Sequence, residues 1–445
     1  MVDVVVVGAG PTGLWLAGEL RLGGASVTVL ETREAPDPHS KALTIHPRTI
    51  ELLECRGTAE PFLAEGLRIP NGHFGGLRDR MDFRVLDTPF PFTLALPQAR
   101  TEELFEQRAR SLGAEIRRRH RVTGLTPGGV TAEGPDGPYE LEARYVVGCD
   151  GTRSTVRTAA GIDFPGTDAT TWGWLGDVVL DDPPGPVNIS GPEGGLMVVP
   201  LPGGIHRFVG GDPVSSLDSP GELTLDELRA TVTRIAGTDY GMRDPVWLSR
   251  FGNATRQAAT YRKGNVFLAG DAAHQHFPTG GVGLNVGVQD AHNLGWKLAA
   301  VVTGRADEAL LDTYHEERHP VGAELLEHSR AQTALITAYT PEGQALRSVL
   351  SGLIATAPDL SKELAERLSG LSVTYATGRR VPNLEFADGT RLFTLLQAGK
   401  HVQLDLTGAV QPRGESIWHS GPLAVGSTAP EWTTALIRPD GHLAA

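Results

Sequence analysis

Cysteine is scarce in this chain of 445 residues, which contains only two, Cys55 and Cys149. They stand far apart and form no Cys-x-x-Cys pair. A disulfide framework is therefore excluded, and so is a thiol redox centre of that type. So few thiols are typical of proteins in reducing compartments, and we expect a cytoplasmic protein.

Positive charge is also in short supply. The chain has 40 Lys and Arg residues against 53 Asp and Glu residues, for a formal net charge of −13 at pH 7. Nucleic acids and anionic membranes are bound by clustered cations, so this balance argues against both as partners. We expect the partner to be a small molecule, and the protein to be a monomer or a homodimer.

Long hydrophobic runs are missing as well. No stretch approaches the roughly 18 consecutive apolar residues that a membrane-spanning helix needs. The first apolar run, Val4 to Val7, has no basic residues before it, so it predicts a strand rather than a signal peptide. With 40% hydrophobic and 21% charged residues, the composition is typical of a soluble globular protein of two or three domains.

Glycine, by contrast, is plentiful, and one glycine motif follows the first strand directly. Val2 to Val7 predict a strand buried in a parallel sheet, and the next six residues lead from it into a helix. Gly8 makes the tight turn, Gly10 lets the backbone approach a pyrophosphate, and Gly13 lets the helix pack closely. The motif predicts dinucleotide binding; the alternative is a tight turn without a ligand. The expected cofactor contacts here are Gly8, Gly10, Pro11, Thr12 and Gly13.

An acidic residue supports dinucleotide binding. A second strand is predicted over Ser26 to Leu30, and Glu31 stands at its tip, eighteen residues beyond Gly13. A carboxylate at that position accepts hydrogen bonds from ribose hydroxyls and favours an unphosphorylated ribose.

A second glycine segment lies much further along the chain. Val266 to Ala269 predict a short buried strand ending at Gly270-Asp271, where a carboxylate can accept hydrogen bonds from a flavin's ribityl hydroxyls. The stretch from Pro278 to Asn285 then opens a long helix. Its N–H groups can stabilise the anionic edge of a reduced flavin, and its glycines let the ring lie against bare backbone. The alternative is a glycine-rich helix entry that serves packing alone. The expected cofactor contacts are Asp271, Pro278, Gly281, Gly283, Leu284 and Asn285, with Pro278, Gly280 and Gly281 forming the loop beside the flavin ring.

Three separated motifs carry a resemblance to a known family. They are the Gly8 to Gly13 segment, Tyr145 to Arg157 (YVVGCDGTRSTVR), and Gly270 to His274 (GDAAH) with Asn293 to Leu298 (NLGWKL). In this order they resemble the class A flavoprotein monooxygenases, which have the para-hydroxybenzoate hydroxylase fold. Over essentially its whole length, the chain is similar to the actinobacterial aromatic polyketide hydroxylases and rifampicin monooxygenases of that family.

The resemblance implies both fold and activity. The fold is α/β, with a Rossmann-like FAD-binding domain and an inserted β-sheet substrate domain. FAD is reduced by NADPH or NADH that binds transiently, which agrees with the lack of a second dinucleotide motif in the sequence. O2 then forms a flavin C4a-hydroperoxide, which inserts one oxygen atom into a phenolic or quinone-type polycyclic substrate. No protein nucleophile and no metal is expected. Baeyer–Villiger insertion, and antibiotic inactivation in place of biosynthesis, stay open.

The resemblance also implies roles for residues outside the glycine segments. Asp150, in the Asp-Gly pair, is expected to serve both FAD and nicotinamide binding. Gln98 is expected near the phosphate and ribityl region of FAD. Lys41 stands where relatives more often carry arginine, so a flexible point charge replaces a planar fork at that flavin contact. Val282 replaces a common glutamine in the glycine loop.

Changes in the sequence pattern along the chain predict its domain boundaries. The FAD-binding domain is expected to comprise residues 1–70, 98–172 and 264–390. The substrate-binding β-sheet domain is expected at 71–97 and 173–263, where strand-like stretches are broken by Pro and Gly. Its expected pocket walls are Phe74, Met197, Val199 and Phe208.

The last part of the chain, residues 391–445, reads differently. Short strands are predicted over residues 392–395, 402–406 and 435–438, with Arg438-Pro439-Asp440-Gly441 as a turn. Relatives carry a thioredoxin-like domain here. This copy has no Cys-x-x-Cys, so redox work is excluded, and whether the domain is complete stays open.

Two other motifs point to different chemistry and are disfavoured. His315 to His319 matches the His-Glu-x-x-His zinc signature, but Pro320 biases His319 away from helical geometry and no third ligand is evident. Trp172-Gly173-Trp174 resembles the Trp-x-Trp of flavin halogenases, but Leu175-Gly176 follows where those enzymes have Ile-Pro. A non-catalytic flavin-binding or drug-binding protein is a further alternative, since fold alone does not prove turnover.

Overall fold

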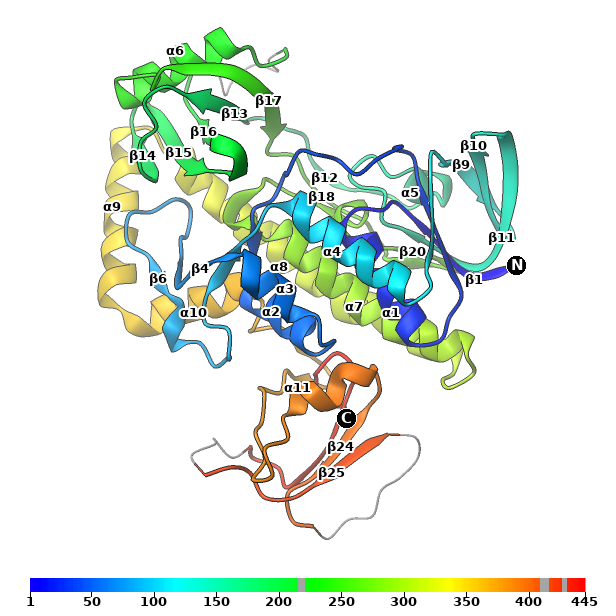
Figure 1. Cartoon of the computed structure of the whole chain (residues 1–445). Helices are drawn as coiled ribbons and strands as arrows, with labels where there is room; N and C mark the ends of the chain where they lie inside the picture. The colour runs from blue at the N-terminus through cyan, green and yellow to red at the C-terminus, as the bar shows by residue number, and fades with distance from the viewer. Residues whose placement is uncertain (215–220, 409–415, 426–429, 445) are drawn as a thin grey trace.

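A mixed sheet with parallel middle strands lies on the right in Figure 1, and β10 and β9 extend it from β11 as an antiparallel pair. The structure is a computed structural model that describes residues 1–214, 221–408, 416–425 and 430–444. The sheet has the order β19-β20-β11-β1-β2-β8, and its middle strands pair in parallel. The strands are β1 (Val2–Val7), β2 (Val27–Glu31), β8 (Glu115–Arg118), β9 (Arg121–Thr126), β10 (Gly129–Gly134), β11 (Gly137–Gly148), β19 (Arg262–Lys263) and β20 (Val266–Leu268).

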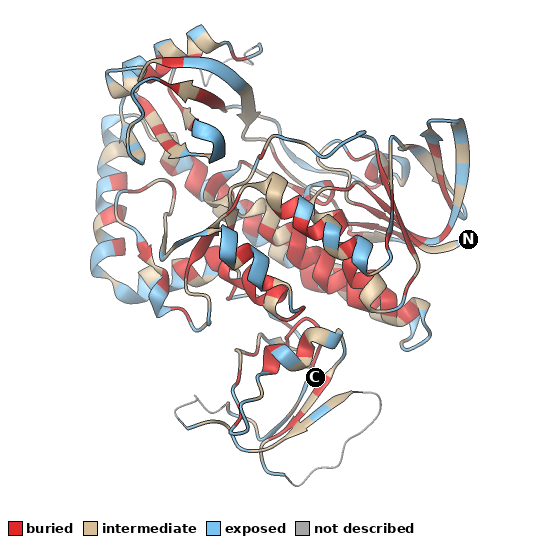
Figure 2. Cartoon of the chain, in the orientation of Figure 1, coloured by how far each residue is buried: buried red, intermediate tan, exposed pale blue. Residues whose placement is uncertain are grey.

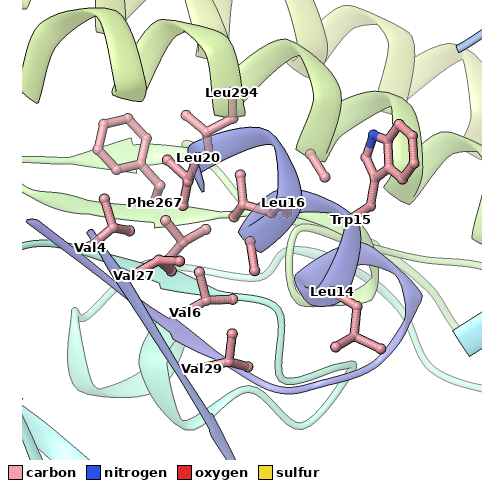
Figure 3. Close-up of a cluster of buried hydrophobic side chains, with 14 of the residues drawn as sticks. Val4, Val6, Leu14, Trp15, Leu16, Leu20, Val27, Val29, Phe267 and Leu294 are labelled. Atoms are coloured by element: carbon pink, nitrogen blue, oxygen red, sulfur yellow. The ribbon is translucent and has the colours of Figure 1, made fainter. Parts of the chain in front are cut away.

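Helices pack on this sheet and enclose the largest core. The principal ones are α1 (Pro11–Leu22), α4 (Gln98–Ser111) and α7 (Gly283–Val302). Figure 2 shows buried positions concentrated along α1 and α7. Figure 3 shows Val4 and Val6 of β1 beside Leu16 and Leu20 of α1, with Leu294 of α7 behind them. Burying each such side chain stabilises the fold by about 1.5–3 kcal/mol, so this core fixes the entry angle of both helices.

A second sheet lies above the first and is antiparallel, with the order β14-β15-β16-β13-β17 (Figure 1). Helix α6 (Leu225–Ala236) covers one of its faces, where Leu228 and Val232 pack against Trp174, Val178 and Phe208. The other face is therefore left for the rest of the protein. The strands are β13 (Trp172–Leu180), β14 (Val187–Gly191), β15 (Gly194–Pro200), β16 (Ile205–Gly211) and β17 (Met242–Gly252).

A long helix and a helical hairpin follow α7, and the hairpin packs on β6 (Met81–Asp82). They are α8 (Asp312–Ile336), α9 (Pro341–Thr356) and α10 (Pro358–Ser369). The expectation that Pro320 draws His319 out of helical geometry is wrong, because α8 runs through both residues. Buried side chains on both sides of the proline, including Tyr314 and Leu325, hold the helix together, and the amide of Gln257 binds the His319 carbonyl at 2.7 Å.

The last part of the chain forms a small mixed sheet. In it β24 (Val402–Asp405) pairs in parallel with β25 (Ile417–Ser420) and antiparallel with β26 (Thr434–Ile437). Two of the predicted strands are thus confirmed within a residue. The predicted strand at 392–395 is wrong, because this segment is the helix α11 (Leu392–Leu395). Leu392, Phe393 and Leu396 are buried at helical spacing, and a four-residue apolar run cannot by itself distinguish strand from helix.

Shorter elements connect these layers. No helix among the described residues combines the length and the apolar character needed to cross a bilayer. The shorter elements are α2 (Pro47–Glu54), α3 (Ala59–Glu65), α5 (Thr155–Ala159), β3 (Thr44–Ile45), β4 (Leu67–Ile69), β5 (Asn71–Gly72), β6 (Met81–Asp82), β7 (Thr93–Ala95), β9 (Arg121–Thr126), β10 (Gly129–Gly134), β12 (Gly166–Thr167), β18 (Thr255–Gln257), β21 (His274–Gln275), β22 (Thr374–Tyr375) and β23 (Gly378–Arg379).

Candidate cofactor and substrate site

The two glycine segments, far apart in sequence, meet at the start of α1. A Cβ atom added to Gly270 would lie 2.7 Å from the hydroxyl of Thr12, and one added to Gly287 would lie 2.4 Å from it. Thr12 is therefore packed between the turn after β20 and helix α7. Because those backbones approach so closely, the first motif and the Gly270-Asp271 turn border the same space.

The three glycines of the first motif have different surroundings. Gly8 has a φ of +103°, and a Cβ there would lie 2.4 Å from the Cys149 carbonyl oxygen. A Cβ on Gly13 would lie 2.1 Å from the Gly8 carbonyl oxygen. Gly10 is the exception, because nothing lies within 4 Å of the Cβ position. Gly8 and Gly13 thus serve the turn, while the open side of Gly10 fits a pyrophosphate that approaches the backbone.

Glu31 is fixed beside this motif. It is buried at the end of β2, where one carboxylate oxygen accepts the Ala9 N–H at 2.8 Å and the other accepts the Arg33 N–H at 2.8 Å. A carboxylate has lone pairs beyond these two bonds. Its position at the end of β2 is compatible with ribose hydroxyls, and this contact stays a prediction.

Asp271 has an exposed side chain, in contrast to its surroundings. It lies on the turn that follows β20, and the N–H of the preceding Gly270 donates to the buried carboxylate of Asp290 at 3.1 Å. Asp290 also binds the imidazole of His274 at 2.7 Å and accepts the Arg318 Nε–H at 2.7 Å. The backbone under Asp271 is thus held from behind, while its carboxylate stays free to accept hydroxyl groups of a ligand.

The glycine loop before α7 is fastened by side chains. Gly280 and Gly281 both have positive φ, +66° and +64°, and a Cβ on Gly281 would lie 2.0 Å from the Thr44 hydroxyl. The Asn285 amide donates to the Gly281 and Thr44 carbonyls at 2.9 and 3.1 Å, and its oxygen accepts the His46 N–H at 2.8 Å. Both ends of the Asn285 side chain are used, so it holds the loop, and its predicted contact with the cofactor stays a prediction.

His46 holds the same loop from the side of β3. Its Nε2 lies 2.8 Å from the Gly280 carbonyl oxygen. Burial lowers the pKa of the imidazole to about 4, against a smaller opposite effect of this hydrogen bond. The ring is therefore neutral at pH 7, with its proton on Nε2 to donate to Gly280. No motif indicates this role, because a single histidine carries no pattern.

Comparison with known proteins agrees with this geometry. Residues 1–329 match the family model described as the FAD binding domain. The chain belongs to this family. The resemblance to flavoprotein monooxygenases read from the motifs is thereby confirmed, and FAD is the cofactor. The open Gly10 and the exposed Asp271 carboxylate fit the phosphates and the ribityl hydroxyls of FAD.

Relatives within the FAD-binding family cover the chain almost completely. It is 46% identical to an uncharacterized aromatic compound monooxygenase of Bacillus subtilis, over 99% of this chain and 93% of the relative. It is 43% identical to rifampicin monooxygenase of Streptomyces venezuelae, over 100% and 95%. The solved anhydrotetracycline hydroxylase OxyS of Streptomyces rimosus is 42% identical with a TM-score of 0.91, over 100% and 95%. One relative is not named as a monooxygenase: dialkyldecalin synthase of Streptomyces rugosporus is 40% identical over 99% of this chain and 95% of the relative.

Other predicted cofactor residues of this FAD-binding protein have structural duties. Asp150 caps α5, since its two carboxylate oxygens accept the Ser154 hydroxyl at 2.5 Å and the Val156 N–H at 3.1 Å. Burial raises the pKa of Asp150, and these hydrogen bonds oppose the shift. Its predicted contacts with FAD and nicotinamide stay predictions. Leu284 packs against the main core, and Pro278 is exposed at the start of the glycine loop.

Gln98 and Lys41 lie on neighbouring segments. The Gln98 amide oxygen accepts the Ala42 N–H at 3.0 Å, and its nitrogen donates to Glu102 at 2.7 Å. Lys41 is exposed. The carbonyl before it, on Ser40, accepts a hydrogen bond from the buried Arg207 of β16. The antiparallel sheet thus holds the segment that carries Lys41.

Strand alternation decides which sheet residues face the flavin domain. Arg207 of β16 reaches Ser40, and Phe251 of β17 packs on Phe277 with ring centroids 5.1 Å apart. Residues in register with these lie on the same face, because paired strand residues share a side. The register places Met197, Val199, Leu175 and Val209 there.

The structure corrects the prediction that Phe208 is a wall of the substrate pocket. It lies opposite Val198, is fully buried, and packs with α6 in the core of the sheet domain. It therefore faces away from the flavin domain. The neighbouring residue, Val209, lies on the face toward the flavin domain, where Phe208 was expected. A period of two shows that the faces alternate but not which face is covered, and only the position of α6 decides that.

Phe74 lies in a loop close to the flavin segment. It packs beside Leu335 and Leu368, and Leu368 lies 2.8 Å from where a Cβ on Gly280 would be. The N–H of the next residue, Gly75, donates to the Gln332 side chain at 3.1 Å. These contacts put Phe74 near the glycine loop, and its contact with a substrate stays a prediction.

Proposed function

We propose that this protein is an FAD-dependent, NAD(P)H-consuming monooxygenase that inserts one oxygen atom into a phenolic or quinone-type polycyclic substrate. The observation that carries the proposal is the position of an apolar sheet face beside the fastened glycine loop. We further propose that it works in the cytoplasm as a monomer or a homodimer, with no nucleic acid or membrane partner. The names of its relatives support the reaction class.

The residues of this chain bind and orient FAD and enclose the reaction site. Bound FAD supplies hydride acceptance from NAD(P)H and activation of O2. Gly10 admits its pyrophosphate, Glu31 its ribose and Asp271 its ribityl chain. The N–H groups at the start of α7 can stabilise negative charge on the reduced ring, as helix N-termini do. No side chain of the protein has to act as a nucleophile.

The apolar sheet face suits a flat, multi-ring substrate. Met197, Val199 and Val209 offer aliphatic surface, which excludes water from the oxygen-transfer region. The charged groups on this face, Asp177 and Arg207, are bonded to each other at 2.6 and 2.7 Å. Their charges are satisfied, so the substrate is selected mainly by shape and apolar contact.

The proposal is tested with the holoenzyme, NADPH and a panel of anthracyclines, angucyclines and rifamycins. We expect at least one compound to accelerate NADPH oxidation and to yield a product heavier by one oxygen atom. A panel member of rifamycin type as the preferred substrate would favour antibiotic inactivation over biosynthesis. Carbon NMR of the product separates a new phenol from the ester or lactone of a Baeyer–Villiger insertion.

A second candidate function follows from the dialkyldecalin synthase relative, whose name describes no oxygenation. If this chain catalysed a reaction without oxygenation, the product would gain no oxygen atom and no NADPH would be consumed. The same experiment therefore separates the two candidates. A protein that only binds flavin or drug would show neither NADPH oxidation nor a product.

A further inference from the structure

The turn Arg438–His442 lies against the FAD-binding domain in a dense group of buried charges. Arg438 donates to Glu317 of α8 at 2.6 and 2.8 Å and to Asp440 at 2.5 and 3.1 Å. Asp440 accepts the indole N–H of Trp296 of α7 at 3.1 Å. All four residues are at least nine-tenths buried. The turn, which directly follows β26, therefore joins α7 to α8.

The main chain of the same turn is held by two buried arginines. Arg48 donates to the Asp440 carbonyl at 2.6 Å, and Arg56 donates to the Pro439 carbonyl at 3.0 Å. Arg56 is paired with Glu19 of α1, the helix that begins at the first glycine motif. Backbone and side chains of the turn are thus both fixed to the cofactor domain.

A continuous path leads from this turn to the cofactor site. The Tyr375 ring packs on the His442 ring, with centroids 4.3 Å apart, and under the Arg438 guanidinium at 5.1 Å. The Tyr375 hydroxyl accepts a hydrogen bond from Arg318 at 3.1 Å, and Arg318 binds Asp290 at 2.7 Å. Asp290 in turn holds the N–H of Gly270, next to Asp271.

We propose that the turn Arg438–His442 positions the FAD-binding turn Gly270–Asp271 through Tyr375, Arg318 and Asp290. These are positioning residues, since none of them needs to touch the cofactor. The inference rests on the proposed role of Asp271 as a ligand of the ribityl chain. Arg318 and His274 both orient the Asp290 carboxylate that holds Gly270. Of these two, Arg318 bonds to the aromatic ring that the turn supports.

The chain offers variants that cut this path at two points. Tyr375→Phe keeps the ring but removes the hydroxyl that binds Arg318. Arg438→Lys keeps the charge but loses the planar fork that reaches Glu317 and Asp440 together. Arg391→Lys is the matched control, because Arg391 is exposed in the same small domain and pairs with Glu385 only at 3.7 Å. Leu404→Ala is the control for general loss of stability, because Leu404 is fully buried in β24.

The measurement is a fluorescence titration of the full-length apoprotein with FAD, together with visible circular dichroism of the bound flavin and thermal unfolding of the apoprotein. We expect Tyr375→Phe and Arg438→Lys to raise the Kd for FAD about tenfold, the usual effect of losing one charge-assisted hydrogen bond, and to alter the flavin dichroism. Arg391→Lys should leave both unchanged. Leu404→Ala should lower the unfolding temperature with a smaller change in Kd.

Wild-type affinity in both path variants would overturn the inference, and so would a Leu404→Ala variant that loses as much FAD affinity as Arg438→Lys at equal stability. No turnover is needed for this titration. A protein that binds FAD with the expected variant pattern but oxygenates nothing would therefore contradict the proposed function alone. A protein that oxygenates its substrate but shows no variant effect would contradict the inference alone.

Discussion

Asp271 is the residue on which cofactor retention depends most directly. Its carboxylate is exposed while the backbone before it is tied to Asp290, so the side chain is fixed in place and free to bind. Replacing it by alanine removes hydrogen bonds from the ribityl hydroxyls to a charged group, each worth about 1.5–3 kcal/mol. We therefore expect Asp271→Ala to weaken FAD binding about 10- to 100-fold.

The absorbance of flavin that copurifies with Asp271→Ala, and its FAD titration, check this expectation. The unfolding temperature of the apoprotein should hardly change, because the side chain is exposed. Asp226→Ala, at an exposed site on α6, serves as control and should retain full flavin. If Asp271→Ala kept full flavin at the wild-type rate, the assignment of this carboxylate would be wrong.

His46 makes the stability of the protein depend on pH. Its pKa is about 4 in the folded protein against an ordinary value near 6.5, so the unfolded chain binds more protons in this interval. Protonation therefore favours unfolding, and stability is lost as the pH falls from about 6.5 to 4. For this one group, lowering the pH from 7 to 5 costs about 2 kcal/mol.

The variant His46→Gln isolates this contribution, since an amide can still donate to the Gly280 carbonyl without titrating. Urea unfolding at pH 7 and pH 5 gives the comparison. We expect the loss of unfolding free energy between these pH values to be smaller in the variant by about 2 kcal/mol. An identical loss in both proteins would show that His46 is not buried in its neutral form.

Substitutions at two glycines in and after the turn between β1 and α1 should affect different properties, FAD binding at Gly10 and stability at Gly13. Gly10 has a φ of −79° and open space at its Cβ position, so Gly10→Ala should fold normally. The added methyl group would occupy the path of the pyrophosphate, and FAD affinity should fall more than about tenfold. Gly13→Ala, 2.1 Å from a carbonyl oxygen, should instead destabilise the apoprotein by about 1–3 kcal/mol. Paired titration and urea unfolding test both variants, and the two effects appearing in the opposite assignment would refute the geometry.

Two neighbouring residues of β16 should also differ in their effects, because Phe208 lies in the core and Val209 on the face toward the flavin domain. Phe208→Ala should cost about 3–5 kcal/mol of unfolding free energy, because the ring is fully buried against α6. Val209→Ala should leave stability nearly unchanged but raise the KM for an aromatic substrate by about tenfold or less, through lost apolar contact. Urea unfolding and substrate-dependent NADPH oxidation measure the two effects. A KM change in Phe208→Ala without one in Val209→Ala would reverse the assignment of the faces.

Local patterns were sufficient for some elements and not for others. The valine run of β1 and the glycine turn into α1 are determined by nearby residues, so they could be predicted. Helix α11 could not, because its four apolar residues suit a strand equally well. Helix α8 continues through Pro320 because packing on both sides outweighs one missing hydrogen bond. Whether Phe208 or Val209 lines the pocket depends on α6, which is distant in sequence.

At the scale of the whole molecule, the site is a product of tertiary contacts. The motifs predict cofactor contacts at its glycines and at Asp271, because each needs a particular local geometry. The side chains that fasten the site could not be predicted, since His46 belongs to no motif. The hydrogen bonds that Asn285 and Asp150 make within the protein had no signal in the sequence either, and the predicted cofactor contacts of both residues stay predictions. Such roles depend on neighbours that only the folded chain brings together.

One cofactor can stabilise the whole fold, because it is expected to contact segments that are far apart in the sequence. The first glycine motif, the Gly270-Asp271 turn and the loop before α7 come from separate parts of the sequence and border one space. A ligand that binds all three stabilises the folded state by an amount that grows with the logarithm of its concentration relative to Kd. FAD is therefore expected to raise the unfolding temperature, and more so in the wild type than in Gly10→Ala.

A spectroscopic titration of the apoprotein with FAD tests the cofactor site at first hand. We expect a yellow protein that binds one FAD per chain at saturation, with the visible absorbance of an enclosed flavin. A protein that is purified colourless and shows no saturable binding of added FAD would contradict this expectation.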